Sequence, residues 1–333
     1  MNSALRFKSS HIEILDRLDN VYKSAIRKDV SHGLTTSQKF IPSKYFYDAR
    51  GSKLFEEICC LPEYYPTKTE MSILKHFARD IMSSFNNGDL VELGSGANSK
   101  IRVLLDAVDE SEMSTIRYIP VDVSKTALIA ASEELLDAYP GLKVTGIVAD
   151  FTRHADVIPH DRDKLIVFFG STIGNFNVED AVTFLRRISD SMKPGDRFLF
   201  GLDMLKSKET LEAAYNDSKG ITSEFNKNVL SVLNRELNAD FNPSHFDHVA
   251  FFNEEKERVE MHLRANRRIS IEISDLKLMV ELQKGETIHT EVCRKFSRAS
   301  AEQMICEAGL NITQWYSDTG ERVSLVEVSL KDS

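Results

Sequence analysis

The feature that most constrains the fold is an alternation of apolar runs and helical segments between residues 89 and 204. Five runs read as strands, at 89–93, 116–123, 143–150, 164–170 and 196–204, with helices at 101–108, 125–139 and 178–192. Consecutive strands joined by helical crossovers run parallel. The runs are almost continuously apolar, which indicates strands buried on both faces. The sequence therefore predicts an α/β domain with a doubly wound sheet.

The flanking regions have different patterns. Residues 1–85 read as mostly helical, because Ile14, Leu15 and Leu18 recur at helical spacing. After residue 204 a helical stretch, 206–238, precedes four strand-like runs with short polar connections, at 258–266, 268–274, 276–283 and 289–297. Short connections indicate antiparallel pairing. A helix at 297–310 and a hairpin of 311–318 with 322–330 end the sequence.

These patterns predict two domains. We assign 1–204 and 296–333 to the α/β domain, with a helical N-terminal region and an antiparallel C-terminal hairpin. Residues 205–295 form an inserted α+β subdomain. The chain of 333 residues has an ordinary globular composition, with 42 % hydrophobic and 28 % charged residues.

Charge and cysteine content limit the partners and the compartment. The 42 basic and 51 acidic residues give a net charge of −9, which argues against nucleic acid as a partner. The 4 cysteines lack the spacing of a disulfide framework or a zinc site, which favours a reducing compartment. We find no signal peptide and no run of about 18 apolar residues, which a membrane span requires. We therefore expect a cytoplasmic protein, without membrane or nucleic-acid partners, that acts as a monomer.

A glycine loop follows the first predicted strand. The segment VELGSGANSK (91–100) places Gly94 and Gly96 at a strand end, where backbone can approach a ligand closely. It is neither a Walker A loop nor G-x-G-x-x-G, because position 99 is Ser. The pattern E-x-G-x-G, with acidic Asp122 ending the second strand, favours S-adenosylmethionine. In that arrangement Asp122 accepts hydrogen bonds from the ribose.

Two further strand ends carry candidate ligand groups. Asp150 and Phe151 end the third strand, where a carboxylate and a backbone N–H can read an adenine edge. GSTIGN, from Gly170 to Asn175, follows the fourth strand and offers amide contacts to a polar substrate such as an α-amino acid. The alternative is that these residues make only turns and helix caps. Strand ends in register favour a ligand site, since ligands bind at the carboxyl ends of such strands.

Other candidates lie outside the predicted sheet. Tyr47 and Tyr64 carry hydroxyls in an aromatic segment, 44–70. Three further candidates lie in the predicted subdomain with Cys293: Tyr215, Met261 and Glu291. Glu291 and Cys293 are two residues apart and share a strand face, where the carboxylate can bind an N–H-bearing side chain. For each of these residues taken singly, ordinary packing or a solvated strand edge is the alternative.

The sequence shows neither a histidine spacing typical of a metal site nor the motif of a serine hydrolase. The spacing of His154, His160, His245 and His248 matches no H-x-x-x-H or H-E-x-x-H pattern. G-x-S-x-G is absent as well. We therefore predict no metal site.

At these residues the sequence resembles the histidine Nα-methyltransferases of ergothioneine biosynthesis. The matching segments run from about residue 40 to the C-terminus: KYFYDARGSKLFEEICCLPEYYPTKTE, ELGSGANSK, VFFGSTIGNF, AAYNDSKGITSEFNKNVLSVLNRELNADF, ERVEMHLRA and TEVCRKF. The resemblance implies a Rossmann-like class I methyltransferase fold with an inserted substrate-binding domain. It also implies three methyl transfers from S-adenosylmethionine to the α-amine of L-histidine, giving hercynine.

The resemblance also implies residue roles. The cofactor positions are Gly94, Gly96, Lys100, Asp122, Asp150 and Phe151. Asn175 and Tyr215 hold the substrate carboxylate, and Tyr47 lies near the amine as a possible proton relay. The remaining substrate contacts are Tyr64, Gly170, Met261, Val292 and Cys293, with Glu291 binding the imidazole.

One departure bears on specificity. Histidine-specific members carry Ser where this chain has Cys293. A thiol is the weaker hydrogen-bonding group, and the exchange costs about 1 kcal/mol, too little to abolish histidine recognition. The alternatives are the same chemistry on another amino acid such as tryptophan, methylation of a ring nitrogen, or a non-catalytic member that binds S-adenosylmethionine. A nicotinamide dehydrogenase is a weaker alternative.

Overall fold

The chain divides into two compact units in the computed structural model. The structure describes residues 6–8, 12–16, 21–83, 85, 87–96, 98–152 and 157–331. The first unit comprises 1–19, 69–204 and 296–333, and the second comprises 20–68 and 205–295. We describe each unit by itself. Within the described residues, no helix combines the length and apolar character needed to cross a membrane.

The first unit is built on a 9-stranded sheet in the order β1-β2-β6-β5-β4-β7-β8-β15-β14. The strands are β1 (Arg6–Lys8), β2 (Ile12–Asp16), β4 (Gly88–Leu93), β5 (Ile116–Asp122), β6 (Lys143–Val148), β7 (Lys164–Phe168), β8 (Arg197–Asp203), β14 (Leu310–Ser317) and β15 (Val323–Leu330). Strands β4 to β8 pair in parallel, and β15 pairs antiparallel with both β8 and β14. The predicted doubly wound sheet with its antiparallel hairpin is confirmed.

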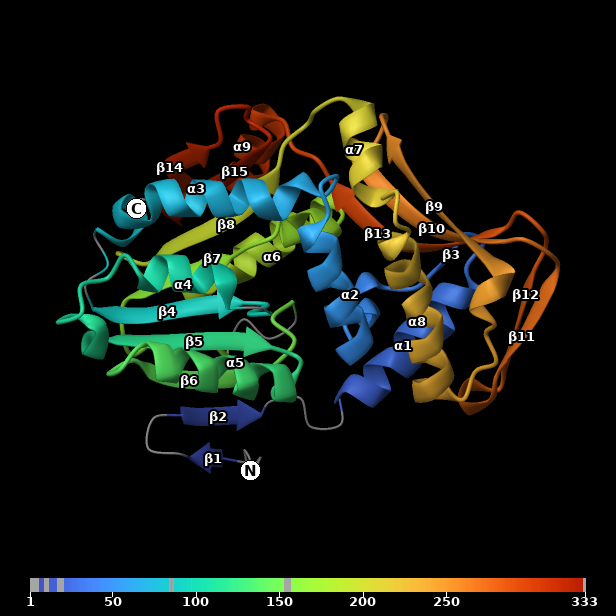
Figure 1. Cartoon of the computed structure of the whole chain (residues 1–333), viewed down its shortest axis with the longest axis horizontal. Helices are drawn as coiled ribbons and strands as arrows, with labels where there is room; N and C mark the ends of the chain where they lie inside the picture. Colours follow the sequence, from blue (N-terminus) through green and yellow to red (C-terminus); the bar gives the residue numbers. More distant parts are fainter. Residues whose placement is uncertain are drawn as a thin grey trace. The chain divides into compact units, whose positions relative to one another are not determined.

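Helices cover both faces of this sheet. They are α3 (Tyr65–Met82), α4 (Ser99–Leu105), α5 (Lys125–Ala138), α6 (Val178–Ser191) and α9 (Arg298–Glu307). Buried residues of α6 and α9 form one core cluster with the strands, while α4 and α5 lie on the opposite face (Figure 1). All six residues of β4 are buried. Burial on both faces accounts for strands without polar alternation.

The N-terminal segment differs from the prediction. Ile12–Asp16 is a strand that pairs in parallel with β6, so the predicted helical repeat at Ile14 and Leu15 is wrong. Ile14 is fully buried and packs with Leu128 of α5. The pairing with β6 is a long-range contact that overrides the local apolar spacing, which is ambiguous over so few residues. Residue 18 lies outside the described residues.

The second unit combines helices with a mixed four-stranded sheet. Its main helices are α1 (Val21–Thr35), α2 (Ala49–Cys60), α7 (Lys208–Tyr215) and α8 (Ile221–Leu237). The sheet order is β3-β13-β10-β9, from β3 (Lys39–Phe40), β9 (Phe246–Asn253), β10 (Arg258–Ala265) and β13 (Thr287–Arg294). Strands β11 (Ile269–Ile273) and β12 (Leu278–Leu282) form a separate hairpin. The predicted antiparallel pairing is present, and the sequence analysis missed β3 and β9.

The unit boundaries can be set beside the predicted domains. The chain passes between units after residues 204 and 295, where the sequence analysis placed its breaks. Residues 20–68, however, cluster with 205–295 rather than with the α/β sheet. The short strand β3 pairs in parallel with β13, and α2 packs on α8. These contacts join segments more than 150 residues apart, so no local pattern signals them.

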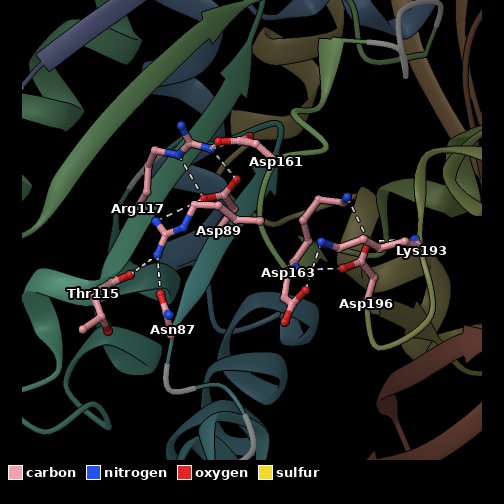
Figure 2. A network of polar contacts seen from close by, with 10 residues as sticks. Asn87, Asp89, Thr115, Arg117, Asp161, Asp163, Lys193 and Asp196 are labelled. Carbon is pink, nitrogen blue, oxygen red and sulfur yellow. Dashed lines mark hydrogen bonds and ion pairs between the residues drawn. The ribbon is translucent and has the colours of Figure 1, made fainter.

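A polar network lies at the amino ends of the parallel strands (Figure 2). Asp89, the second residue of β4, is fully buried and pairs with Arg117 at 2.6 Å. Lys164 and Asp196 form a second ion pair at 2.8 Å, and both side chains are fully buried. Because ligands bind at the opposite ends of such strands, we attribute this network to stability.

Candidate active site

The glycine loop of the first unit leaves space at the carboxyl end of β4. Gly94 and Gly96 have φ values of +69° and +37°, a region that favours glycine. A Cβ atom at Gly94 would lie 3.5 Å from the ring of Phe151. The loops after β4 and β6 therefore meet, as the strand-end argument predicts. The open backbone beside an aromatic ring suits a flat heteroaromatic ligand.

Of the two predicted acidic residues, Asp122 ends β5 and Asp150 lies two residues after the end of β6, and both hold local turns. Asp122 Oδ1 accepts from Ser124 N at 2.8 Å, and Asp150 Oδ1 accepts from Thr152 N at 3.0 Å. Burial raises the pKa of Asp122, while backbone N–H groups, including that of Gly96, oppose the rise. Asp122 thus ties the glycine loop to β5. Ribose and adenine recognition by these carboxylates stays a prediction.

A buried carboxylate also links the glycine loop to the loop after β7. Glu70 of α3 is 1 % exposed and forms an ion pair with Lys100 of α4. Its Oε1 and Oε2 accept from Gly170 N at 2.9 and 3.0 Å. A Cβ at Gly201 would lie 2.2 Å from Glu70 Oε1, so this arrangement requires glycine there. The sequence analysis missed Glu70, the last residue of the aromatic segment, because its partners Lys100 and Gly170 lie in distant parts of the chain.

The substrate residues predicted after β7 belong to the same unit. Gly170 has a φ of +79° and lies near Lys100, whose Nζ would be 3.7 Å from a Cβ at that position. Asn175 ends the short 3-10 helix Thr172–Asn175 and is half-buried. The structure therefore brings Gly170 together with the predicted cofactor residues. The other predicted substrate residues are in the second unit.

Three predicted tyrosines gather in the second unit around two phenylalanines. Tyr47 contacts Phe55 and Phe225, each with a centroid distance of 5.6 Å. Tyr64 contacts Phe55 at 6.2 Å and Tyr215 at 6.3 Å. Four of these five rings come from α2, α7 or their flanks. The sequence analysis missed Phe55 and Phe225. The contacts of Phe225 with Tyr47 and Phe55 arise only when α2 packs on α8.

The hydroxyl groups of Tyr47 and Tyr64 remain protonated at neutral pH. Burial raises the pKa of both well above the ordinary value, and the negative charge of Glu291 raises it further. Although 37 % of the Tyr47 surface is exposed, its hydroxyl is desolvated. Neither phenol therefore acts as a standing base, and each offers an O–H donor and an oxygen acceptor.

Strands β10 and β13 bring the remaining candidates onto one face. Met261 pairs directly with Glu291, and Val259 pairs with Cys293. Paired residues share a face, and alternation places Met261 with Val259, so Glu291 and Cys293 face the same side. Val292 pairs with Glu260, so its side chain lies on the opposite face and only its backbone can serve the predicted role.

Burial dominates the electrostatics of Glu291. It raises the pKa of the carboxyl to about 7, while the positive charge of Lys295 opposes the rise. Removing a carboxylate from water costs folding free energy, and the raised pKa of Glu291 reflects this cost. A desolvated carboxylate is typical of a ligand site, where an N–H group of the ligand compensates the free energy lost on desolvation.

Lys295 completes this cluster. It is 1 % exposed, and its Nζ donates to Tyr215 Oη and to Cys293 Sγ, both at 3.1 Å. The ammonium also lies 4.9 Å from the centroid of the Tyr215 ring. The sequence analysis missed Lys295, because a lysine near the end of the predicted strand 289–297 reads as an ordinary surface residue.

A second cluster in this unit has the composition of a metal site. Glu260, His262 and His289 place three possible ligand atoms within 4.8 Å of one another. The sequence analysis missed the histidine pair because the two face each other across strands, while His154 lies outside the described residues. Arg258 pairs with Glu260 at 2.7 Å, and its charge opposes a cation there. We assign this cluster no metal.

Comparison with known proteins identifies close relatives. The sequence model of the family "Histidine-specific methyltransferase, SAM-dependent" matches residues 26–330. Two proteins called histidine N-alpha-methyltransferase are 44 % and 41 % identical, from Mycolicibacterium smegmatis and Mycobacterium tuberculosis. Each alignment covers 88 % of this chain and 91 % of the relative. An L-tryptophan methyltransferase from Psilocybe serbica is 28 % identical over 81 % of this chain and 82 % of its own.

Proposed function

Because the chain belongs to the family of SAM-dependent, histidine-specific methyltransferases, we propose that it methylates the α-amine of L-histidine three times and so makes hercynine, the first step of ergothioneine biosynthesis. The observation that carries the proposal is half-buried Glu291, whose desolvated carboxyl lies opposite Met261 on a shared face with Cys293. A carboxylate there accepts the N–H of an imidazole ring. The two mycobacterial relatives carry that substrate in their names.

The first unit fits S-adenosylmethionine. The space at Gly94 beside Phe151, and the carboxylates of Asp122 and Asp150, suit the adenosine part of the molecule. Glu92, at the end of β4, is buried, and burial raises its pKa to about 8 although Tyr118 donates a hydrogen bond to it. The cation of the bound molecule would favour the charged form of this carboxyl. S-adenosylmethionine supplies an electrophilic methyl group when bound.

The protein's own task is to present a neutral amine in the right place. Direct displacement on a sulfonium needs no strong base, so alignment supplies most of the rate. We infer that Asn175 and Tyr215 hold the substrate carboxylate and Glu291 the far end of the side chain. Repeated methylation requires room around the amine, and supplying it is the role that we propose for the small residues of GSTIGN. Tyr47 serves as a neutral hydroxyl that passes the amine proton on.

The alternative substrate is tryptophan, because one relative is called an L-tryptophan methyltransferase. An indole offers only an N–H donor, whereas an imidazole offers an N–H and an acceptor nitrogen. Glu291 and Cys293 together provide two polar groups on the inner face. These two polar groups can hydrogen-bond the N–H and the acceptor nitrogen of an imidazole. An indole would leave one of the two groups without a hydrogen bond. We therefore favour histidine.

An amino-acid panel tests this function. The purified chain is incubated with S-adenosylmethionine and each standard amino acid, and the products are identified by mass spectrometry. We expect methylation of histidine alone, with binding of S-adenosylmethionine in a separate titration. Methylation of tryptophan instead would show that tryptophan is the substrate. Binding of S-adenosylmethionine without any product would show that the chain is a non-catalytic member.

Tyr47→Phe tests the proton relay. The substitution keeps the ring contacts with Phe55 and Phe225 and removes only the hydroxyl, so thermal stability should change little. We expect kcat to fall about 10–100-fold, at the low end of general acid–base effects, with a smaller change in KM. Stopped assays should resolve mono-, di- and trimethylated products. Unchanged rates for all three steps would show that the amine proton leaves through water alone.

Cys293→Ser tests the departure from the family pattern. A hydroxyl is the stronger hydrogen-bonding group, so we expect the KM for histidine to fall by up to about 5-fold, which corresponds to about 1 kcal/mol. Cys293→Ala, which removes the polar atom, should raise KM by a similar factor. Initial-rate kinetics of the three proteins decide the matter. A KM that rises in the serine variant would mean that the thiol is itself selected.

A cytoplasmic location, a monomeric state and the absence of nucleic-acid partners stay predictions of the sequence. Sedimentation of the purified chain measures the second of these.

A further inference from the structure

The inference concerns Lys295, which no step above uses. Its ammonium connects two predicted substrate-binding side chains, because it donates to both Tyr215 Oη and Cys293 Sγ at 3.1 Å. The side chain is 1 % exposed, and a buried ammonium has a high desolvation cost. All the residues involved lie in the second unit.

An ammonium has only donors, and this fixes the direction of both hydrogen bonds. When Lys295 donates to the phenol oxygen, the hydrogen of the Tyr215 hydroxyl must point to another acceptor. When it donates to the sulfur, the thiol hydrogen of Cys293 is likewise turned away from it. Each group then presents a hydrogen-bond donor to its surroundings.

Resting on the proposed function, we propose that Lys295 is a positioning residue that makes Tyr215 a donor to the substrate carboxylate and Cys293 a donor to the imidazole. The positive charge beside Tyr215 also favours an anion at its hydroxyl. On the inner face, Glu291 then accepts and Cys293 donates. This pair is complementary to a neutral imidazole, which carries one N–H and one bare nitrogen.

A double-mutant cycle tests whether Lys295 acts through Tyr215. The variants are Lys295→Met, Tyr215→Phe and the double variant, and histidine binding is measured by calorimetry alongside KM and kcat. We expect each single substitution to weaken binding about 10-fold or more, chiefly in KM. The double variant should be within about 3-fold of the weaker single variant, because interacting residues are not additive. Additive losses would overturn the proposal.

Lys206 offers a matched control in the same unit. Its Nζ donates to Tyr65 Oη at 2.9 Å and lies 4.4 Å from that ring's centroid, so the chemistry is the same without any predicted substrate contact. Lys206→Met should be additive with Tyr215→Phe. If Lys206→Met shows the same non-additivity, the effect at Lys295 is general loss of packing and the proposal fails.

Two further measurements separate the remaining outcomes. Lys295→Arg keeps a buried cation with donors, so it should recover part of the affinity, and it replaces the methionine variant if that protein does not fold. A fall in kcat and thermal stability with unchanged histidine affinity would show a structural role and contradict the proposal. The wild-type reaction with histidine is measured first, so failure of the proposed function is seen separately. The cycle is then measured on whichever amino acid binds, since all share the carboxylate.

Discussion

Glu291→Gln should lower kcat/KM for histidine about 100-fold, mostly through KM. The substitution keeps the shape of the side chain and removes the charge that accepts the imidazole N–H. Losing one partner of a buried charge-assisted hydrogen bond costs roughly 2–5 kcal/mol, and about 2.7 kcal/mol corresponds to 100-fold. Initial-rate kinetics over a wide histidine range separate KM from kcat.

Glu291→Gln should not be less stable than the wild-type protein. Weaker histidine binding in this variant would therefore not result from a loss of folded protein. Burial raises the pKa of Glu291 from 4.5 to about 7, so its folding contribution is fully present below 4.5 and is lost as pH rises through about 7. At pH 8 the carboxylate therefore opposes folding, by about 3 kcal/mol at most. Glu291→Gln should unfold at the same or a higher temperature there. A destabilised variant would mean that the charged carboxylate itself stabilises the fold.

The KM for histidine should also rise as the pH falls below about 7. Below about 7 the Glu291 carboxyl gains a proton, and the free imidazole gains one in the same range, so binding must release a proton and KM rises. In Glu291→Gln this acid limb should be shallower, because only the titration of the free imidazole is left. Glu260→Gln is the control, because Glu260 is a buried carboxylate of the same sheet on the opposite face. An acid limb of unchanged steepness in Glu291→Gln would show that Glu291 does not contribute to it.

Asp196→Ala should destabilise the first unit by about 3–5 kcal/mol, because it leaves a buried lysine without its counter-charge. Lys164 and Asp196 are both fully buried, and the carboxylate also accepts from the backbone N–H groups of Lys164 and Lys193 at 2.8 and 2.9 Å (Figure 2). Urea unfolding measures the loss as a lower midpoint with an unchanged slope.

The neighbouring ion pair supplies the control for this prediction. Asp163 pairs with Lys193 at 3.0 Å, but its side chain is 71 % exposed, and such pairs contribute little. Asp163→Ala should therefore leave the midpoint nearly unchanged. Both variants should bind S-adenosylmethionine normally at low temperature, since the network lies at the amino ends of the strands. Weaker cofactor binding in a folded Asp196→Ala protein would contradict that placement.

The parallel sheet was predictable because each strand is a local apolar run followed by a helix. The prediction failed for β2, which was read as helical, and for β3, which was missed. Both failures have the same cause, because each strand pairs with a segment that is distant in the sequence. Ile12–Asp16 becomes a strand only by pairing with β6, and β3 forms by pairing with β13. The membership of residues 20–68 in the second unit depends on such contacts as well. A local pattern carries no information about them.

The candidate site was readable to the extent that it follows strand ends and strand faces. Gly94, Asp122 and Asp150 lie where the strand-end argument places them, and Glu291 shares a face with Cys293. Glu70 and Lys295 were missed, because each has a partner in a distant segment, Gly170 for Glu70 and Tyr215 for Lys295. Neither a buried glutamate nor a buried lysine can be told from a surface residue without the fold.

The central claim is that the chain places three methyl groups on the α-nitrogen of histidine. The most direct measurement is the structure of the product, by fragmentation mass spectrometry and NMR after full conversion with S-adenosylmethionine. We predict a trimethylammonium at the α-carbon and an unmodified imidazole ring. A methyl group on a ring nitrogen would contradict the orientation of histidine between Tyr215 and Glu291, and with it the account of the site.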